Sequence, residues 1–375
     1  MFLFILLLVG IALASLYLSW RLHRGLAVFF PRLPYWPICA LTFMIAILLA
    51  LGFVQALLPI SSGTKHILSL VSGYSMSICV YWALFTILSE IILLIARFFP
   101  VHRHFRGFVT LGVITLTAIT CIGGFIHARE ISHVTYHIQL EGKKDISDIH
   151  MVMISDLHLG AIGSESRLPD IVEEINGLNP DIICIAGDFF DTDFNTIQDP
   201  DAAIKTLQGL RATYGTYACL GNHDGGKTYQ KMIDFLNQAN IHLLNDDYAI
   251  IDERFVIVGR LDGFPIGGYG DEARKDLDDI FAREDATLPV IVMEHNPANI
   301  HEYTVEADLI LSGHTHKGQI FPANLVTDRL FAVDYGYFRE GPNRPHVIVS
   351  SGIGTWFMPM RVGSDCEIVS IRFSH

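Results

Sequence analysis

The pattern of hydrophobic positions divides the chain into two halves. Up to about residue 128 the apolar residues form long runs, and four of these are long enough to cross about 30 Å of hydrocarbon. The runs lie at residues 1–20, 37–60, 67–96 and 108–126. Beyond residue 128, short apolar runs alternate with segments of helical period. The pattern predicts four transmembrane helices in residues 1–128 and a folded domain in residues 129–375.

The pattern in the folded domain is first an alternation of strands and helices and then mostly strands. Such an order is typical of an α/β domain with two packed sheets and outer helices. A glycine-rich stretch at 261–276 predicts a long surface loop. Helical segments are expected at 167–178, 201–211 and 229–240. Strands are expected at 134–140, 149–155, 216–220, 248–259, 288–294, 307–312, 346–351 and 367–373, and a further strand after a turn within 179–188.

Charge separates the two halves as clearly as hydropathy does. Residues 1–128 hold seven Lys or Arg and a single acid, Glu90, which leaves 19 basic and 38 acidic residues for residues 129–375. The second half therefore has a formal charge of −19. A surface this acidic repels a phosphate backbone, so we expect no nucleic-acid partner.

The distribution of arginines predicts the orientation of the spans. Three arginines lie between the first and second spans and three between the third and fourth, whereas the middle loop has only Lys65. Because basic loops stay in the cytoplasm, the N-terminus and the folded domain are both expected outside. Glu90 lies inside the third span and is either a functional group or an acid that reaches the membrane interface.

Residue types that bind metals follow five of the expected strands. Open α/β sheets bind ligands at the carboxyl ends of their strands. Several acids and imidazoles buried there would be costly without partners, and metal ions would provide them. The sequence therefore predicts a dimetal site. The blocks are SDLHLG (Asp156, His158), AGDFFD (Asp188, Asp191), LGNHDGG (Asn222, His223, Asp224), EHNP (His295) and SGHTHKG (His314, His316).

The ligand types narrow the choice of metal. Carboxylate, imidazole and amide groups without a thiolate suit Mn²⁺, Fe or Zn²⁺. The six cysteines have no spacing that indicates a zinc site or a disulfide framework. Two ions about 3.5–4 Å apart would lower the pKa of a bound water and bind the oxygens of a phosphate ester.

Taken together, the blocks DLH, GDFFD, GNHD, a lone His and GHTH resemble the signature of the calcineurin-like metallophosphoesterase superfamily over residues 148–373. The resemblance implies a four-layer αββα sandwich that hydrolyses phosphoesters by attack of a metal-bound hydroxide. The segments GHTHKGQ and GIGTWFMPM resemble a bacterial membrane-associated branch that acts on phosphodiesters or lipid-linked pyrophosphates. We therefore expect an integral protein of the bacterial inner membrane with an extracytoplasmic catalytic domain.

The same resemblance implies a role for each site residue. Two divalent ions are expected, Mn²⁺ in the first place, with Fe or Zn²⁺ as alternatives. His223 would protonate the leaving oxygen, Asp224 would orient His223, and Asp191 would support the site. The implied ligands are Asp156, His158 and His316 for the first ion, Asn222, His295 and His314 for the second, and Asp188 as the bridge.

Three functions fit these observations. The first is a membrane-anchored phosphoesterase acting on a lipid-linked or envelope-derived substrate. The second is a UDP-diacylglucosamine-type pyrophosphatase of lipid A synthesis, against which the expected outside location argues. The third is a non-catalytic binding protein, against which the complete set of blocks argues. An apolar cluster at residues 356–358 would either line a lipid-facing groove or pack in the core.

Overall fold

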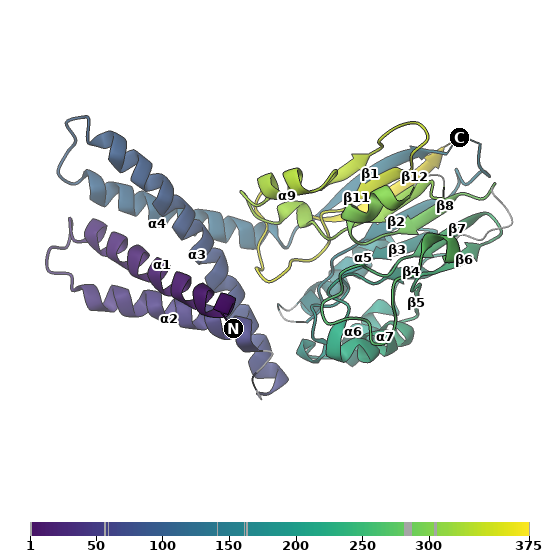
Figure 1. The fold of residues 1–375 in the computed structure, drawn as a ribbon, viewed down its shortest axis with the longest axis horizontal. Helices are drawn as coiled ribbons and strands as arrows, with labels where there is room; N and C mark the ends of the chain where they lie inside the picture. The colour runs from purple at the N-terminus through teal and green to yellow at the C-terminus, as the bar shows by residue number, and fades with distance from the viewer. Residues whose placement is uncertain are drawn as a thin grey trace. The chain divides into compact units, whose positions relative to one another are not determined.

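The computed structural model describes residues 2–374 apart from 56, 57, 59, 141, 161, 163, 281–286, 304 and 305. The chain divides into two compact units, and Figure 1 labels their elements. The first unit comprises Met1–Ile126 with Phe357–Met360, and the second comprises His127–Trp356 with Arg361–His375. All the candidate site residues belong to the second unit.

The first unit is helical. Within the described residues its helices are α1 (Phe2–Leu26), α2 (Tyr35–Val54), α3 (Ser62–Ala96) and α4 (Phe105–His127). Of the described helices, three, namely α2, α3 and α4, are long and apolar enough to cross a membrane. The expected span at 1–20 falls in α1, and the side chains of residues 1–8 lie outside the described set, as does the end of the second run at 56, 57 and 59. The fourth span stays a prediction.

The packing of the helical unit is the reverse of that in a water-soluble protein. Large apolar side chains point outward, as Ile47, Ile87 and Ile119 do with exposed fractions of 57%, 58% and 63%. Small polar side chains such as Ser72 and Ser77 are fully buried between helices. Small and hydroxyl residues at helix contacts are typical of helices that pack within lipid.

The second unit contains two mixed sheets in the described part of the chain, each of six strands. One has the order β1-β12-β2-β3-β4-β5 and the other β10-β11-β9-β8-β7-β6. In chain order the strands are β1 (Ile131–Gln139), β2 (His150–Ile154), β3 (Ile182–Ala186), β4 (Thr216–Cys219), β5 (Ile241–Leu243), β6 (Asp247–Ile251), β7 (Phe255–Gly259), β8 (Val290–Met293), β9 (Leu309–Ser312), β10 (Gly336–Phe338), β11 (His346–Val349) and β12 (Cys366–Ser374).

Successive side chains of each strand point to opposite faces of its sheet, and this separates the core between the two sheets from the cores beneath the outer helices. In β2, Met151 and Met153 belong to the core between the sheets, whereas Val152 and Ile154 belong to the cluster beneath the helices. The helices on that face are α5 (Leu168–Gly177), α6 (Pro200–Leu207) and α7 (Tyr229–Gln238). A third cluster packs α8 (Leu277–Ile280) and the 3-10 helix η5 (Pro297–Glu302) on the outer face of the second sheet. The expected α/β fold of two packed sheets is confirmed.

Two details of the strand prediction were wrong. The run 248–259 is not one strand, because β6 and β7 form an antiparallel hairpin within it. Its turn contains Asp252 and Glu253, both with a positive φ of 51°. These two adjacent acids between apolar runs could have indicated the turn. The short strands β5 and β10 were also not predicted, since three residues carry almost no period.

Strand direction positions the site. β2, β3 and β4 run parallel to one another in the first sheet. β7, β8 and β9 run parallel in the second sheet. The carboxyl ends of parallel strands meet at one edge, so the loops after these strands are neighbours.

Candidate metal centre

The candidate ligands occupy the loops that follow β2, β3, β4, β8 and β9, as the sequence predicted. The backbone of these loops is unusual, because several of the residues have left-handed φ values: Asp156 54°, His158 48°, Asp188 50°, His314 72° and His316 51°. Residues other than glycine adopt this region rarely and at a cost of order 1–3 kcal/mol each. Such a concentration of strained residues is typical of functional sites.

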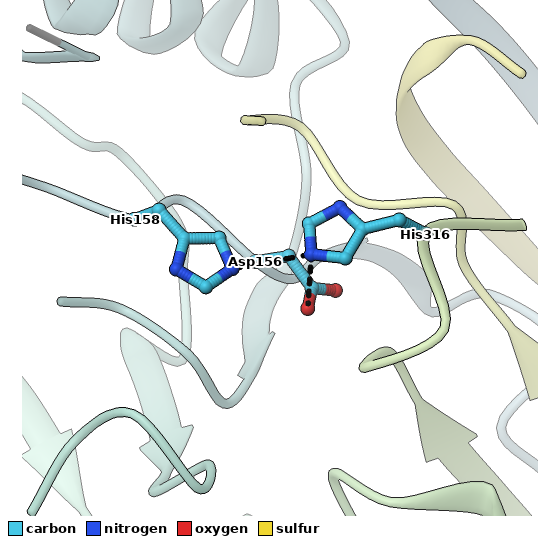
Figure 2. Close-up of side chains that lie close together, drawn as sticks. All are labelled: Asp156, His158 and His316. Carbon is cyan, nitrogen blue, oxygen red and sulfur yellow. Dashed lines mark hydrogen bonds and ion pairs between the residues drawn. The ribbon is translucent and has the colours of Figure 1, made fainter. Parts of the chain in front are cut away.

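The first group of side chains consists of Asp156, His158 and His316, whose donor atoms all lie within 4.8 Å of one another. Figure 2 shows the three side chains facing a common point. The Nε2 atoms of the two histidines are 3.1 Å apart, and Nε2 of His316 is 3.4 Å from Oδ1 of Asp156. All three residues are buried. These are the residues expected to hold the first ion.

The second group consists of Asp188, His295 and His314, again with donor atoms within 4.8 Å. Nε2 of His295 lies 3.1 Å from Oδ2 of Asp188. Oδ1 of Asn222 lies 2.8 Å from Nδ1 of His314, which brings the expected amide ligand to the same group. Oδ2 of Asp188 is also 3.8 Å from Nε2 of His158, so this carboxylate reaches both groups.

His223 lies beside these groups and is held by a residue that the sequence did not indicate. Its Nδ1 is 2.7 Å from the hydroxyl of Thr192 and 3.9 Å from Oδ1 of Asp191. Its backbone N–H donates to Oδ1 of Asp188 at 2.8 Å. His158, Asp191 and His223 form a third cluster of donor atoms within 4.8 Å. A hydroxyl at this position leaves no signature in the sequence, so Thr192 was missed.

The expectation that Asp224 orients His223 needs correction. The buried carboxylate of Asp224 accepts hydrogen bonds from three backbone N–H groups, those of Phe189 at 3.2 Å, Phe190 at 2.8 Å and Gly221 at 2.8 Å. It therefore ties the GDFF loop to the GNHD loop. The side chains that contact the His223 ring through Nδ1 are Thr192 and Asp191.

Two glycines allow the loops to come this close. A Cβ atom on Gly221 would overlap Oδ1 of Asp188, and one on Gly313 would overlap Oδ2 of Asp156. Any other residue at either position would displace a carboxylate of the site. The glycines in GNHD and GHTH are thus required by close approach of the backbone to the ligands.

A buried arginine supports His316. Arg361 has no exposed surface and donates to the backbone oxygen of His316 at 3.0 Å and to that of Gly354 at 2.6 Å. Its guanidinium also lies 3.2 Å from Nδ1 of His316. Sequence reasoning missed Arg361, and the available signal was a charged residue directly after the apolar run MPM.

The glycine-rich stretch 261–276, expected to be a surface loop, is anchored to the site. The hydroxyl of Tyr269, which is 2% exposed, donates to the backbone oxygen of Gly221 at 2.8 Å. The N–H of Ile266 donates to the backbone oxygen of Asn222 at 2.8 Å. Arg274 pairs with the buried Glu294, directly before His295, at 2.6 Å. The loop therefore joins the GNHD block to the EHNP block.

Burial and charge set the protonation states of the groups. Burial lowers the pKa of His158 to about 3 and that of His314 to about 4, so both imidazoles are neutral at pH 7. Burial alone would raise the pKa of Asp188, but His295 and the other nearby histidines hold it well below its usual range. Neutral imidazoles and an ionised carboxylate are the states in which these groups bind metal.

The donor set fits divalent ions. Nε2 of His295 lies 3.1 Å from Oδ2 of Asp188, and Nε2 of His158 lies 3.1 Å from Nε2 of His316. Buried donor atoms gathered this closely are costly unless a cation binds them. The set combines imidazole, carboxylate and amide without a thiolate, which suits Mn²⁺, Fe or Zn²⁺. The assignment of each ligand to an ion stays a prediction.

Comparison with known proteins identifies the family. Residues 146–318 match the family model of the calcineurin-like phosphoesterases. This segment therefore matches a calcineurin-like phosphoesterase domain, which confirms the resemblance drawn from the five blocks.

Three relatives illustrate the range of the match. A metallophosphoesterase of Helicobacter pylori is 29% identical over 60% of this chain and 60% of its own length. A transmembrane protein with a metallophosphoesterase domain from Danio rerio is 26% identical over 70% of this chain and 62% of its own. The UDP-2,3-diacylglucosamine pyrophosphatase LpxG of Chlamydia trachomatis is 28% identical over 60% of this chain and 83% of its own. The chain spans about 60% of the length of the first of these relatives.

Proposed function

We propose that the chain is a membrane-anchored phosphoesterase that uses two divalent ions to hydrolyse a lipid-linked or envelope-derived phosphoester. The observation that carries the proposal is the convergence of donor atoms from five strand ends into clusters no wider than 4.8 Å. Divalent ions held there would lower the pKa of a bound water and neutralise the charge of the phosphoryl group.

The proposed roles of the ligands follow from their grouping. Asp156, His158 and His316 would hold one ion, and His295, His314 and Asn222 the other. Asp188 is suited to contact both ions, because its Oδ2 lies 3.1 Å from Nε2 of His295 and 3.8 Å from Nε2 of His158. The backbone N–H of His223 on its Oδ1 fixes the direction of this carboxylate.

His223 is suited to hold the proton for the leaving oxygen. Nδ1 of His223 lies 2.7 Å from the Thr192 hydroxyl, and in the tautomer in which this hydroxyl donates to Nδ1 the ring carries its proton on Nε2. That proton is available to the oxygen that departs from phosphorus when the ester bond breaks. Oδ1 of Asp191 lies 3.9 Å from Nδ1 of the same ring. Thr192 and Asp191 would thus position the proton donor.

Exposed apolar side chains at the site support a lipid-linked substrate. The Trp356 ring lies 5.5 Å from the His223 ring and is 46% exposed. Phe264 and Ile266, on the loop bonded to Asn222, are 75% and 43% exposed. Apolar groups exposed next to a polar reaction centre suit a substrate with a phosphate head and an apolar body.

Hydrolysis by the full chain in detergent micelles tests the proposal. Protein stripped of metal and reloaded with Mn²⁺ is offered bis(p-nitrophenyl) phosphate and p-nitrophenyl phosphate, and the ratio of the two rates reports diester or monoester preference. We expect turnover that depends on metal and is lost in Asp188→Asn. The matched control is Asp170→Asn, an exposed aspartate of α5, which should retain full activity.

Absence of turnover in protein that demonstrably binds two ions would contradict the hydrolytic function and favour a non-catalytic binding protein.

A second candidate is a pyrophosphatase acting on a UDP-linked diacylated sugar. The observation that favours it is the match to LpxG, whose name states that substrate. The expected outside location argues against it, because nucleotide sugars are made in the cytoplasm. Hydrolysis of UDP-2,3-diacylglucosamine at a rate above that of simple diesters, together with a C-terminal reporter that is active only in the cytoplasm, would establish this candidate and exclude the first.

A further inference from the structure

The helical unit has a cavity of its own, which the hydrolytic site does not use. It has a volume of about 880 Å³ and lies where α1 and α3 end and α4 begins. One glutamate, Glu90, lines the cavity together with arginines, which give the lining a formal net charge of +4. The arginines are Arg21, Arg24, Arg97, Arg103 and Arg106.

The carboxylate is already engaged. Arg21 of α1 forms an ion pair with Glu90 of α3, and the hydroxyl of Tyr17 donates to the same carboxylate at 2.9 Å. Glu90 is therefore part of a contact between α1 and α3. One carboxylate faces five arginines, so the lining keeps an excess of positive charge.

The remaining arginines lack acidic partners. In the part of the chain that the structure describes, Arg97, Arg103 and Arg106 make no ion pair with a carboxylate, and Arg24 contacts the Trp20 ring, 4.9 Å from its centroid. Several guanidinium groups gathered around one cavity repel one another unless an anion lies between them. The cavity therefore has an excess of positive charge that a bound anion would neutralise.

The walls of the cavity are fixed by close helix contacts. A Cβ atom on Gly25 of α1 would overlap Thr110 of α4, and one on Gly107 would overlap the ring of Phe29. Phe29 itself packs on Phe108 with ring centroids 5.3 Å apart. The arginines therefore line a preformed cavity, and binding need not first organise it.

The chemistry of the lining indicates the ligand. Guanidinium groups bind phosphate oxygens in pairs and are preferred over ammonium groups for this purpose. Trp20 and Tyr17 are the residue types that lie at the level of lipid headgroups. Apolar residues, among them Val28, Leu93 and Leu94, complete the lining. A cavity of this size exceeds what a free phosphate ion fills, and its mixture of charge and apolar surface suits a headgroup with the start of its chains.

We propose that this cavity binds the phosphate group of an anionic phospholipid. Basic cavities between transmembrane helices on the cytoplasmic side bind such headgroups, and the arginine-rich loops are expected on that side. The proposal does not rest on hydrolysis, because none of the lining residues belongs to the metal centre.

Native mass spectrometry of the full chain in detergent tests the proposal. Phosphatidylglycerol, phosphatidylcholine and inorganic phosphate are titrated separately, and the dissociation constant of each is measured. We expect tight binding of phosphatidylglycerol that is about fivefold weaker in Arg106→Gln and on the order of a hundredfold weaker in the triple variant Arg97→Gln/Arg103→Gln/Arg106→Gln. Arg106→Lys should bind more weakly than the wild type and more tightly than Arg106→Gln, since it keeps the charge but loses the paired hydrogen bonds of a guanidinium group.

The matched control is Arg32→Gln, an exposed arginine of the same basic loops that does not line the cavity. It should bind phosphatidylglycerol as the wild type does. An equal loss in Arg32→Gln and Arg106→Gln, or no loss in a folded triple variant, would overturn the proposal. Equal binding of phosphatidylcholine would also overturn it. Binding of inorganic phosphate as tight as that of the lipid, with the same dependence on Arg106, would replace the lipid by free phosphate as the ligand.

Discussion

The Nε2 atoms of His158 and His316 lie 3.1 Å apart, although 158 positions separate the two residues in the chain. Oδ1 of Asp156 lies 3.4 Å from the same atom of His316. Burial lowers the pKa of both imidazoles, that of His158 to about 3, so repulsion between two charged rings does not arise at pH 7. Two neutral imidazoles and a carboxylate that face one point are arranged as ligands of a single cation.

Removal of one ligand of this group should remove one ion. In His316→Ala we expect metal content to fall from two ions per chain to one. Hydrolysis should fall by more than a hundredfold, because loss of a supporting partner alone costs about 10- to 100-fold in metal affinity or activity. Elemental analysis and turnover measure the two effects. His301→Ala, an exposed histidine outside the clusters, is the control, and an unchanged metal content in His316→Ala would contradict the assignment.

Thr192 should act through His223. In Thr192→Val the hydroxyl that lies 2.7 Å from Nδ1 is lost, so the ring loses its orientation. We expect kcat to fall about tenfold, with KM and metal content unchanged, whereas His223→Ala should lower kcat by about 10²- to 10⁴-fold. Thr192→Ser should restore the rate, since it keeps the hydroxyl. A threonine with a purely structural role would instead change thermal stability and leave kcat per folded protein constant.

Metal affinity should depend on pH through Asp156. Burial raises the pKa of this carboxyl to about 6 in the metal-free protein, and only its ionised form binds a cation. Affinity for the first ion, held by Asp156, His158 and His316, should therefore be nearly constant above pH 7 and fall about tenfold per pH unit well below pH 6. His158, with a pKa of about 3, adds no proton competition there. At the second ion burial would lower the pKa of His295, but Asp188 raises it well above its usual value, so a proton on His295 competes with the metal to higher pH. Chelator competition between pH 5 and 8 measures the slope, and a constant affinity down to pH 5 would contradict the prediction.

Trp356 should matter for lipids more than for small esters. Its half-exposed ring lies 5.5 Å from the His223 ring and would contact the apolar part of a substrate. In Trp356→Ala we expect kcat/KM for a lipid-linked phosphoester to fall about 10- to 100-fold, since an aromatic side chain provides on the order of 1.5–3 kcal/mol of apolar contact. Activity on bis(p-nitrophenyl) phosphate should change less than threefold. Equal losses on both substrates would argue against a lipid-linked substrate.

The strand prediction succeeded where burial is complete. The strands β2, β3, β8 and β9 are buried at every position and are apolar apart from His150 at the start of β2 and Ser312 at the end of β9. Because four of the five metal-ligand blocks directly follow these runs and the fifth follows the largely buried β4, the sequence located the site. The hairpin of β6 and β7 was missed, although the two acids of its turn, Asp252 and Glu253, separate its apolar runs.

The contacts that hold the metal-ligand loops in place could not be predicted, because they join segments that are far apart in the sequence. Arg361 reaches His316 across 45 positions, and Tyr269 reaches Gly221 across 48. Asp224 was given a partner in the sequence, His223, that is adjacent in the chain, whereas its carboxylate binds the backbone of the preceding block. Adjacent residues in a tight loop point in different directions, which local sequence does not reveal.

The measurement that tests the central claim most directly is the metal content of the full chain after removal of metal and reloading with Mn²⁺. Two ions per chain are predicted for the wild type and at most one for Asp188→Asn, because Asp188 is the carboxylate that reaches both groups. Two ions in both proteins, or at most one in the wild type, would contradict a dimetal centre bridged by Asp188.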